Sequence, residues 1–249
     1  MYKLFDYTQL EKRQWDKEIL NYIGLIHEFK GRQQLYLSKK PGELDKLIEL
    51  AKCQSTKASN EIEGIVTTNQ RLIQLMEEKT TPKNRNEKEI KGYRYALNLV
   101  HENFEYIPIR PNFILQLHKE MYQFLDVRFG GNFKDTRNEI DTIYPDGRKE
   151  VIFKPLEPYE TPEAIERICN EYNNLISRGT VDPLVVIPVF IHDFLCIHPF
   201  NDGNGRMSRL LTTLLLYKSG YVVGRYISLE KKIQITKDDY YDALSQSSK

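Results

Sequence analysis

The stretch His198-Pro199-Phe200-Asn201-Asp202-Gly203-Asn204-Gly205-Arg206-Met207-Ser208-Arg209 decides how this 249-residue chain is interpreted. A long apolar segment ends just before it at Ile197, and the leucines that follow it recur at helical spacing as far as Gly220. The stretch is therefore expected to be a turn between two helices. Its two glycines let the backbone of such a turn approach a ligand closely.

The residue types in this turn point to phosphate chemistry. A glycine-rich turn that opens a helix is a ready anion site, because free N–H groups and the positive end of the helix dipole face the ligand. Arg206 and Arg209 lie three apart, so we expect both to face one phosphate chain. Asp202 suits Mg²⁺ that also binds phosphate oxygens, and a neutral His198 can take a proton from a hydroxyl. Together they predict transfer of a phosphate-containing group to a hydroxyl.

The same stretch resembles the complete signature of the Fic family, H-x-F-x-[D/E]-G-N-G-R-x-x-R. The similarity extends outward over roughly the last two thirds of the chain, from the segment Phe113–Leu125 to the helix after Arg206. The resemblance implies a mainly α fold, the Fic fold, which is a helical bundle with a small β-hairpin flap. It also implies an N-terminal helical region, 1–105, that carries an inhibitory motif, and a Fic catalytic core, 106–249.

Fic proteins transfer AMP from ATP to a Ser, Thr or Tyr hydroxyl of a target protein, so the resemblance implies ATP as substrate and Mg²⁺ as cofactor. It implies that His198 is the general base and that Asp202 binds the metal. The ATP-binding residues that it implies are Gly203, Asn204, Gly205, Arg206, Arg209 and Tyr241. Phe200 is implied to anchor the turn in the core.

The segment 139–153 is β-prone around Pro145-Asp146-Gly147, and Asp-Gly is a favoured hairpin turn. It resembles the flap of the family, along which the target protein adds a strand. Strand pairing depends on the backbone and on few side chains. The flap is therefore expected to position the hydroxyl of the target without determining which protein is the target.

An N-terminal motif, Ser59-Asn60-Glu61-Ile62-Glu63-Gly64, resembles the inhibitory motif of the family, [S/T]-x-x-x-E-[G/N]. Ser59 and Glu63 lie four apart and are expected to share a helix face. The resemblance places Glu63 against Arg209, the arginine that the γ-phosphate of ATP needs, so that the enzyme is autoinhibited in cis. The alternative is an ordinary helix end capped by Gly64.

Three other functions fit the same residues. The site would remove AMP from modified proteins if Glu63 positioned a water molecule. A site held shut by Glu63 would make the chain a non-enzymatic nucleotide-binding regulator. A metal-dependent nucleotide hydrolase is the third, although His192 and Asp193 lack a third well-spaced metal ligand beside His198.

Charge balance and hydropathy argue against a nucleic-acid-binding protein and against a membrane protein. There are 36 Lys and Arg against 35 Asp and Glu, which gives no bulk electrostatic reason to bind nucleic acid or a membrane. No apolar run reaches the ~20 residues of a membrane span, and the N-terminus lacks the apolar core of a signal peptide. We therefore expect a cytoplasmic protein with no membrane or nucleic-acid partner and with buried thiols. Homo-oligomerisation stays open. Many relatives with the N-terminal motif continue into a C-terminal winged helix, whereas this chain ends at Lys249.

Helical periodicity predicts most of the remaining elements. The expected helices lie around 19–27, 44–51, 68–79, 90–104, 113–125 and 206–219, and another runs from near Pro162 to Gly179. A further helix is expected to begin with Asp182 as its N-cap. Pro188 either kinks this helix or marks its true first turn.

Overall fold

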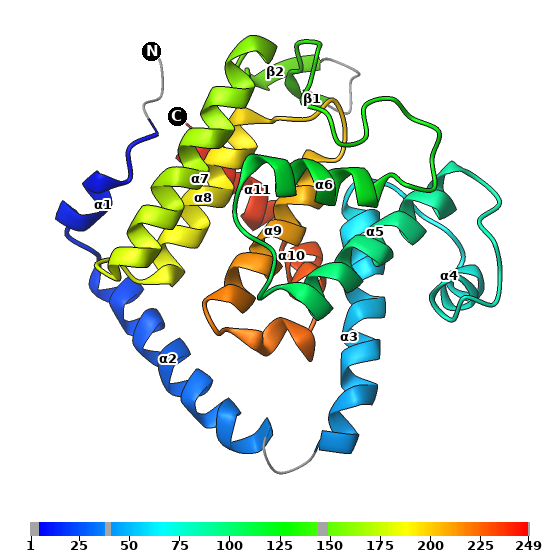
Figure 1. The fold of residues 1–249 in the computed structure, drawn as a ribbon, viewed down its shortest axis with the longest axis horizontal. Helices are drawn as coiled ribbons and strands as arrows, with labels where there is room; N and C mark the ends of the chain where they lie inside the picture. Colours follow the sequence, from blue (N-terminus) through cyan, green and yellow to red (C-terminus); the bar gives the residue numbers. More distant parts are fainter. Residues whose placement is uncertain (1–4, 38–40, 144–148, 249) are drawn as a thin grey trace.

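The structure of the chain is a computed structural model that describes residues 5–37, 41–143 and 149–248. Most of these residues are helical, with one pair of strands (Figure 1). The helices are α1 (Thr8–Lys12), α2 (Lys17–Leu37), α3 (Pro41–Ile62), α4 (Asn69–Met76), α5 (Arg85–Asn103), α6 (Pro111–Met121), α7 (Thr161–Arg178), α8 (Pro183–Ile197), α9 (Asn204–Lys218), α10 (Leu229–Ile235) and α11 (Lys237–Ser247). The strands are β1 (Ile140–Ile143) and β2 (Lys149–Phe153), and short 3-10 turns span Pro158–Glu160 and Val222–Arg225.

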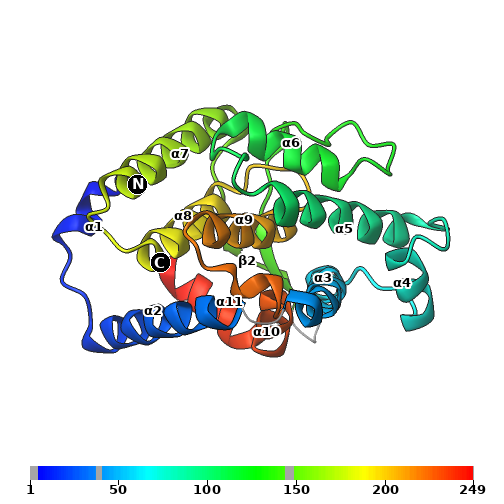
Figure 2. The same cartoon turned by 60° about the horizontal axis from the view of Figure 1, so that its bottom comes forward.

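The core lies around α8 and α9, which pack against each other near the centre of the molecule (Figure 2). Helix α7 covers α8, and α5 lies between α9, α6 and α3. Large buried side chains from these helices and the turn fill the interior: Tyr93, Leu97, Phe190, Phe194, Phe200 and Tyr217. Helix α3 packs against α5 and α10. The division between residues 105 and 106 stays a prediction.

The ends of α7 and α8 follow from local chemistry. Gly179 has φ of 65° and caps the C-terminus of α7, a conformation that glycine adopts without strain. The side chain of Asp182 accepts a hydrogen bond from the Leu184 N–H at 2.8 Å, which confirms it as the N-cap of α8. Pro188 lies inside α8 and does not mark its first turn.

Two of the predicted helices begin or end at other residues than expected. The helix predicted over 90–104 begins at Arg85, because the Asn84 side chain caps it by accepting from the Glu87 N–H at 2.9 Å. The helix predicted over 113–125 begins at Pro111 and ends at Met121. Apolar periodicity did not find either end, because caps and tertiary contacts set them.

The two strands lie in the segment expected to form the flap. They pair antiparallel, with Ile140 opposite Phe153 and Ile143 opposite Lys149. The expected turn at Pro145-Asp146-Gly147 lies outside the described residues. The flap as a binding element therefore stays a prediction.

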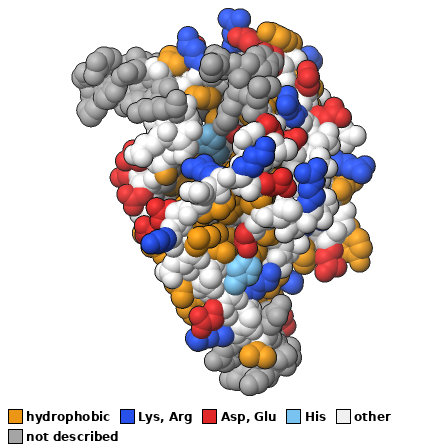
Figure 3. Space-filling model, turned by 90° about the vertical axis from the view of Figure 1, so that its left-hand side faces the viewer, with side chains coloured by type: hydrophobic (Ala, Val, Ile, Leu, Met, Phe, Trp, Pro, Cys, Tyr) orange, Lys and Arg blue, Asp and Glu red, His pale blue; other side chains and the backbone are white. Residues whose placement is uncertain are grey.

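Helix α2 leaves much of its apolar surface exposed. Its exposed side chains include Ile19, Leu20, Tyr22, Leu25, Ile26, Phe29 and Leu35. Figure 3 views the side on which α1 and α2 lie in Figure 1, and hydrophobic side chains gather near the middle of that face. The His27 Nε2 lies 2.6 Å from Asp182 Oδ2, a contact that ties α2 to the start of α8.

The helices and the cysteines of the described residues bear on the expectations about membrane spans and buried thiols. None of their helices combines the length and apolar character that a membrane span requires. The side chains of Cys169 and Cys196 are buried, and that of Cys53 is partly buried. The prediction of buried thiols is therefore confirmed for two of the three.

Candidate active site

The turn between α8 and α9 is held by packing beneath it. The ring of His118 stacks on Phe200, with centroids 3.7 Å apart and planes 3° apart. The Gly131 N–H donates to His118 Nδ1, so Nε2 carries the proton and donates to the Asp202 carbonyl at 3.0 Å. Phe200 is fully buried, as its expected anchoring role requires. His118 therefore positions the turn from α6.

Two residues of the turn close it on itself. The Asn204 amide donates to the Phe200 carbonyl at 2.7 Å and accepts from the Phe200 N–H at 2.9 Å. Gly203 has φ of 82°, and a Cβ there would lie 2.7 Å from Met121 Cε and 2.8 Å from the Tyr122 hydroxyl. Only glycine therefore fits at this position without displacing its neighbours.

His198 caps the C-terminus of α8 in a left-handed conformation, with φ of 52°. Its Nδ1 lies 3.3 Å from the Leu195 carbonyl, which can only accept, so Nδ1 carries the proton. The lone pair of the neutral ring is then on Nε2. Burial lowers the pKa of His198 to about 4. The ring is therefore neutral at pH 7 and able to accept a proton.

Two side chains from the segment 134–138, just before β1, donate hydrogen bonds to the backbone of this turn. The Lys134 ammonium donates to the Ile197 carbonyl at 3.0 Å, and the Asn138 amide donates to the carbonyls of His198 at 3.3 Å and Phe200 at 3.1 Å. Lys134 is buried, and this burial lowers its pKa to about 8. These bonds satisfy the carbonyls at the end of α8, where a cation is also favoured by the helix dipole.

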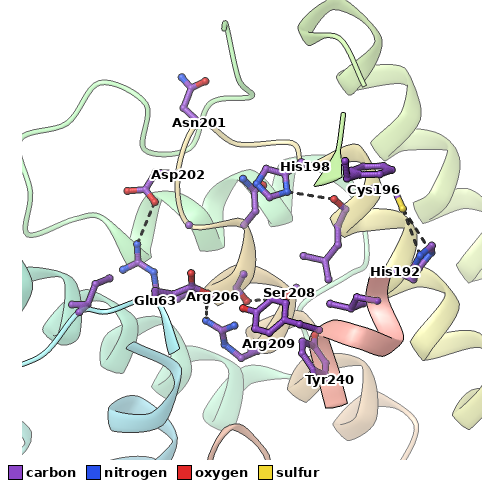
Figure 4. Close-up of a pocket in the computed structure, with 18 of the residues that line it drawn as sticks. Glu63, His192, Cys196, His198, Asn201, Asp202, Arg206, Ser208, Arg209 and Tyr240 are labelled. Carbon is purple, nitrogen blue, oxygen red and sulfur yellow. Dashed lines mark hydrogen bonds and ion pairs between the residues drawn. The ribbon is translucent and has the colours of Figure 1, made fainter. Parts of the chain in front are cut away.

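The turn borders a pocket of about 750 Å³, a size typical of small-molecule sites. Figure 4 shows Asp202 at one end of this pocket and His192 and Cys196 at the other, with His198 and Arg209 between them. The first turn of α9 also lines it, so backbone N–H groups without a partner inside the helix lie at its wall.

Glu63 and Arg209 meet in this pocket although they lie 146 residues apart. The Arg209 guanidinium donates to Glu63 Oε1 at 2.6 Å, to Ser59 Oγ at 2.8 Å and to the Ser59 carbonyl at 2.9 Å. A Cβ added at Gly205 would collide with Glu63 Oε1, so the carboxylate lies directly against the first turn of α9. Glu63 itself lies one residue beyond the end of α3. A carboxylate thus occupies an anion site of the kind that phosphate uses.

Arg206 points away from Arg209. Its side chain is 1% exposed; Nη1 lies 2.7 Å from Glu89 Oε2, and Nη2 donates to the Tyr122 hydroxyl at 2.6 Å. Arg206 thus pairs with α5, whereas Arg209 pairs with the end of α3. The expected common face toward one phosphate chain is not formed in this arrangement, and ATP binding by Arg206 stays a prediction.

The metal expected from the sequence is Mg²⁺, which prefers oxygen ligands. Asp202 presents a carboxylate that is 43% exposed and lines the pocket. Nowhere in the described ranges do three or more His, Cys, Asp or Glu residues gather as a metal site. A single exposed carboxylate fits Mg²⁺, which takes most of its oxygens from phosphates and water.

Helix α11 supplies the remaining wall of the pocket. Tyr240 and Tyr241 both line it, and Tyr241 is 42% exposed. The contact of Tyr241 with ATP stays a prediction. His192 Nε2 lies 3.3 Å from Ser248 Oγ, so Ser248 brings the end of the chain to the same wall.

Sequence reasoning missed the residues that support the site from other elements. They are Tyr122, Lys134 and Asn138, together with Arg85 and Glu89 of α5. The only sequence signal was the spacing of Arg85 and Glu89, which is common on exposed helix faces.

Comparison with known proteins identifies the family. The family model of the Fic/DOC family matches residues 108–216. A Fido domain-containing protein of Dictyostelium discoideum is 34% identical over 110 residues, which cover 41% of this chain and 75% of that protein. The chain therefore belongs to the Fic/DOC family.

The chain is also similar to a protein named as an adenylyltransferase and to a solved Fic domain structure. Protein adenylyltransferase fic-1 of Caenorhabditis elegans is 30% identical over 108 residues, 43% of this chain and 19% of that protein. The chain thus aligns with only about a fifth of that relative. A Fic domain-containing signaling protein of Bacteroides thetaiotaomicron superposes with a TM-score of 0.74 at 23% identity and covers 89% of this chain and 80% of its own. The mainly helical Fic fold is thereby confirmed.

Proposed function

We propose that this chain transfers AMP from ATP to a Ser, Thr or Tyr hydroxyl of a target protein and that Glu63 inhibits the transfer in cis. The observation that carries the proposal is the shared pocket. A histidine with a free Nε2, an exposed carboxylate at Asp202 and the first turn of α9 all border it. The adenylyltransferase names of relatives support the same class of reaction.

In the proposed reaction the target hydroxyl oxygen forms a bond to the α-phosphorus of ATP. The bond from that phosphorus to the oxygen bridging to the β-phosphate breaks, and pyrophosphate leaves. Nε2 of His198 accepts the hydroxyl proton, which its neutral state at pH 7 permits. Backbone N–H groups of the first turn of α9 bind the phosphate oxygens where negative charge develops. Asp202 would hold Mg²⁺, which supplies positive charge to the phosphates.

Inhibition follows from competition for one anion site. The Glu63 carboxylate lies against Gly205 and binds Arg209, so a phosphate group cannot occupy the same place. The other end of the pocket remains available to the nucleoside. ATP would then bind with its phosphate chain displaced, and displacement by about 1 Å can slow an in-line transfer by ~10²-fold.

A second function, removal of AMP from a modified protein, is favoured by one observation. Glu63 is 32% exposed and lines the pocket beside His198, so its carboxylate can orient a water molecule as well as repel a phosphate. The target strand is proposed to bind along 139–153, since Glu139 and Phe153 line the same pocket.

The test incubates the chain with a proteome and with ATP labelled at its α-phosphate. Label bound to protein supports AMP transfer, and free labelled AMP without labelled protein indicates a nucleotide hydrolase. Binding of ATP with neither product indicates a non-enzymatic regulator. Release of AMP from a previously labelled protein, lost in Glu63→Gly, indicates the removal reaction.

A further inference from the structure

Arg85 places a cation at the Asp202 end of the pocket from outside the motif. It is the first residue of α5 and lines the pocket together with its neighbour Asn86. Its side chain is 63% exposed, and Nη2 lies 3.5 Å from Asp202 Oδ2, a contact drawn as the dashed line at Asp202 in Figure 4.

Glu89 fixes the direction of the Arg85 side chain. The Arg85 Nε donates to Glu89 Oε1 at 2.7 Å, and Glu89 Oε2 lies 2.7 Å from Nη1 of Arg206. Glu89 is 3% exposed, so one buried carboxylate holds two guanidinium groups. The Arg206 group is enclosed and the Arg85 group is open. The surplus positive charge of this cluster is therefore presented to the pocket by Arg85.

The position of Arg85 on its helix also argues for an anion. A cation in the first turn of a helix is disfavoured, because the N-terminal end of the helix dipole is already positive. The N-terminus of α9 borders the same pocket, so the ends of two helices and Arg85 add positive potential at one place. Asp202 offsets part of this potential from a side chain that is itself 43% exposed.

We infer that Arg85 is a phosphate-binding residue of this site and binds the triphosphate chain of the nucleotide when Asp202 is engaged by the metal. The inference rests on the proposed function. A carboxylate that binds Mg²⁺ has less charge to share with a guanidinium, whereas the phosphate chain offers several oxygens in the geometry that arginine binds bidentately. Arg85 thereby adds a cation from outside the motif to the phosphate-binding side of the pocket.

The test measures equilibrium binding by calorimetry, with ATP and with adenosine as separate ligands in the presence of Mg²⁺. The variants are Arg85→Ala and Arg85→Lys. The matched control is Arg32→Ala, because Arg32 is 62% exposed and pairs with Glu28 one turn away but lies on α2, outside this pocket. Thermal unfolding of each variant checks that it folds.

Arg85→Ala is expected to raise the Kd for ATP about tenfold and to leave the Kd for adenosine unchanged. Arg85→Lys is expected to restore part of the loss, and the Arg32 variant is expected to bind both ligands as the parent does. An unchanged Kd for ATP in Arg85→Ala overturns the inference. Equal weakening of ATP and adenosine also overturns it, since that result indicates a change in pocket shape.

These readouts do not depend on AMP transfer. If the parent chain binds ATP but labels no protein, the proposed function fails while the role of Arg85 is still decided by the ratio of the two affinities.

Discussion

Replacing Glu63 by glycine tests the proposed inhibition most directly. The change removes the carboxylate that lies against Gly205 and leaves Arg209 with its two bonds to Ser59. Phosphate can then reach the first turn of α9 and the guanidinium. We expect Glu63→Gly to raise AMP transfer and self-labelling.

The expected increase in the rate of AMP transfer follows from the strength of the ion pair between Glu63 and Arg209. Two unit charges ~4 Å apart interact by about 4 kcal/mol at an effective dielectric constant of ~20. The Arg209 side chain is 2% exposed but Glu63 is 32% exposed, so solvent screens part of this attraction. A remaining preference of roughly 2–3 kcal/mol for the inhibited arrangement corresponds to about 30- to 160-fold in rate.

The assay follows protein-bound label from ATP labelled at the α-phosphate, at equal protein concentration. Glu61→Gly is the matched control, because it makes the same change two residues earlier, where the carboxylate binds Gln234 and Lys57 instead. Thermal unfolding midpoints of both variants are compared with that of the parent chain. Equal or lower labelling by Glu63→Gly would refute the competition for Arg209 and identify Glu63 as a helix-end carboxylate or a catalytic group.

Five more outcomes are expected. His198→Ala should lower transfer by ~10²–10⁴-fold with ATP affinity retained in calorimetry; near-parental transfer contradicts its role as base. Because the pKa of His198 is about 4, transfer should stay level from pH 8 to pH 5 and fall toward pH 4, and a fall near pH 6.5 contradicts this protonation state. The same lowered pKa means that the unfolded chain binds more protons below pH 6.5, so the free energy of unfolding should decrease from pH 6.5 to pH 4 in denaturant titrations. Asp202→Ala should weaken Mn²⁺ binding, measured by electron paramagnetic resonance, and remove most transfer; retained metal-dependent activity places the ligand elsewhere. Gly203→Ala should lower the unfolding midpoint, because its Cβ meets Tyr122, and an unchanged midpoint contradicts the close approach.

The amino-acid sequence by itself determined the family and carried the chemistry proposed for the turn. The residues proposed as base, metal ligand and anion site lie within twelve consecutive positions, so their relation does not depend on how distant segments pack. The cap at Asp182 and the stop at Gly179 were also predictable, because both are local hydrogen-bond and backbone effects.

Only the tertiary structure decided which charges are available to a ligand. Two arginines three residues apart look equivalent in the sequence, yet Arg206 is enclosed by Glu89 and Tyr122 while Arg209 meets Glu63. The direction of a long side chain depends on partners that lie 84 to 150 residues away. Such partners have no fixed spacing, because packing of α3 and α5 on α9 brings them together. The physical reason is that periodicity records which face of a helix is buried, whereas pairing depends on which helix covers that face.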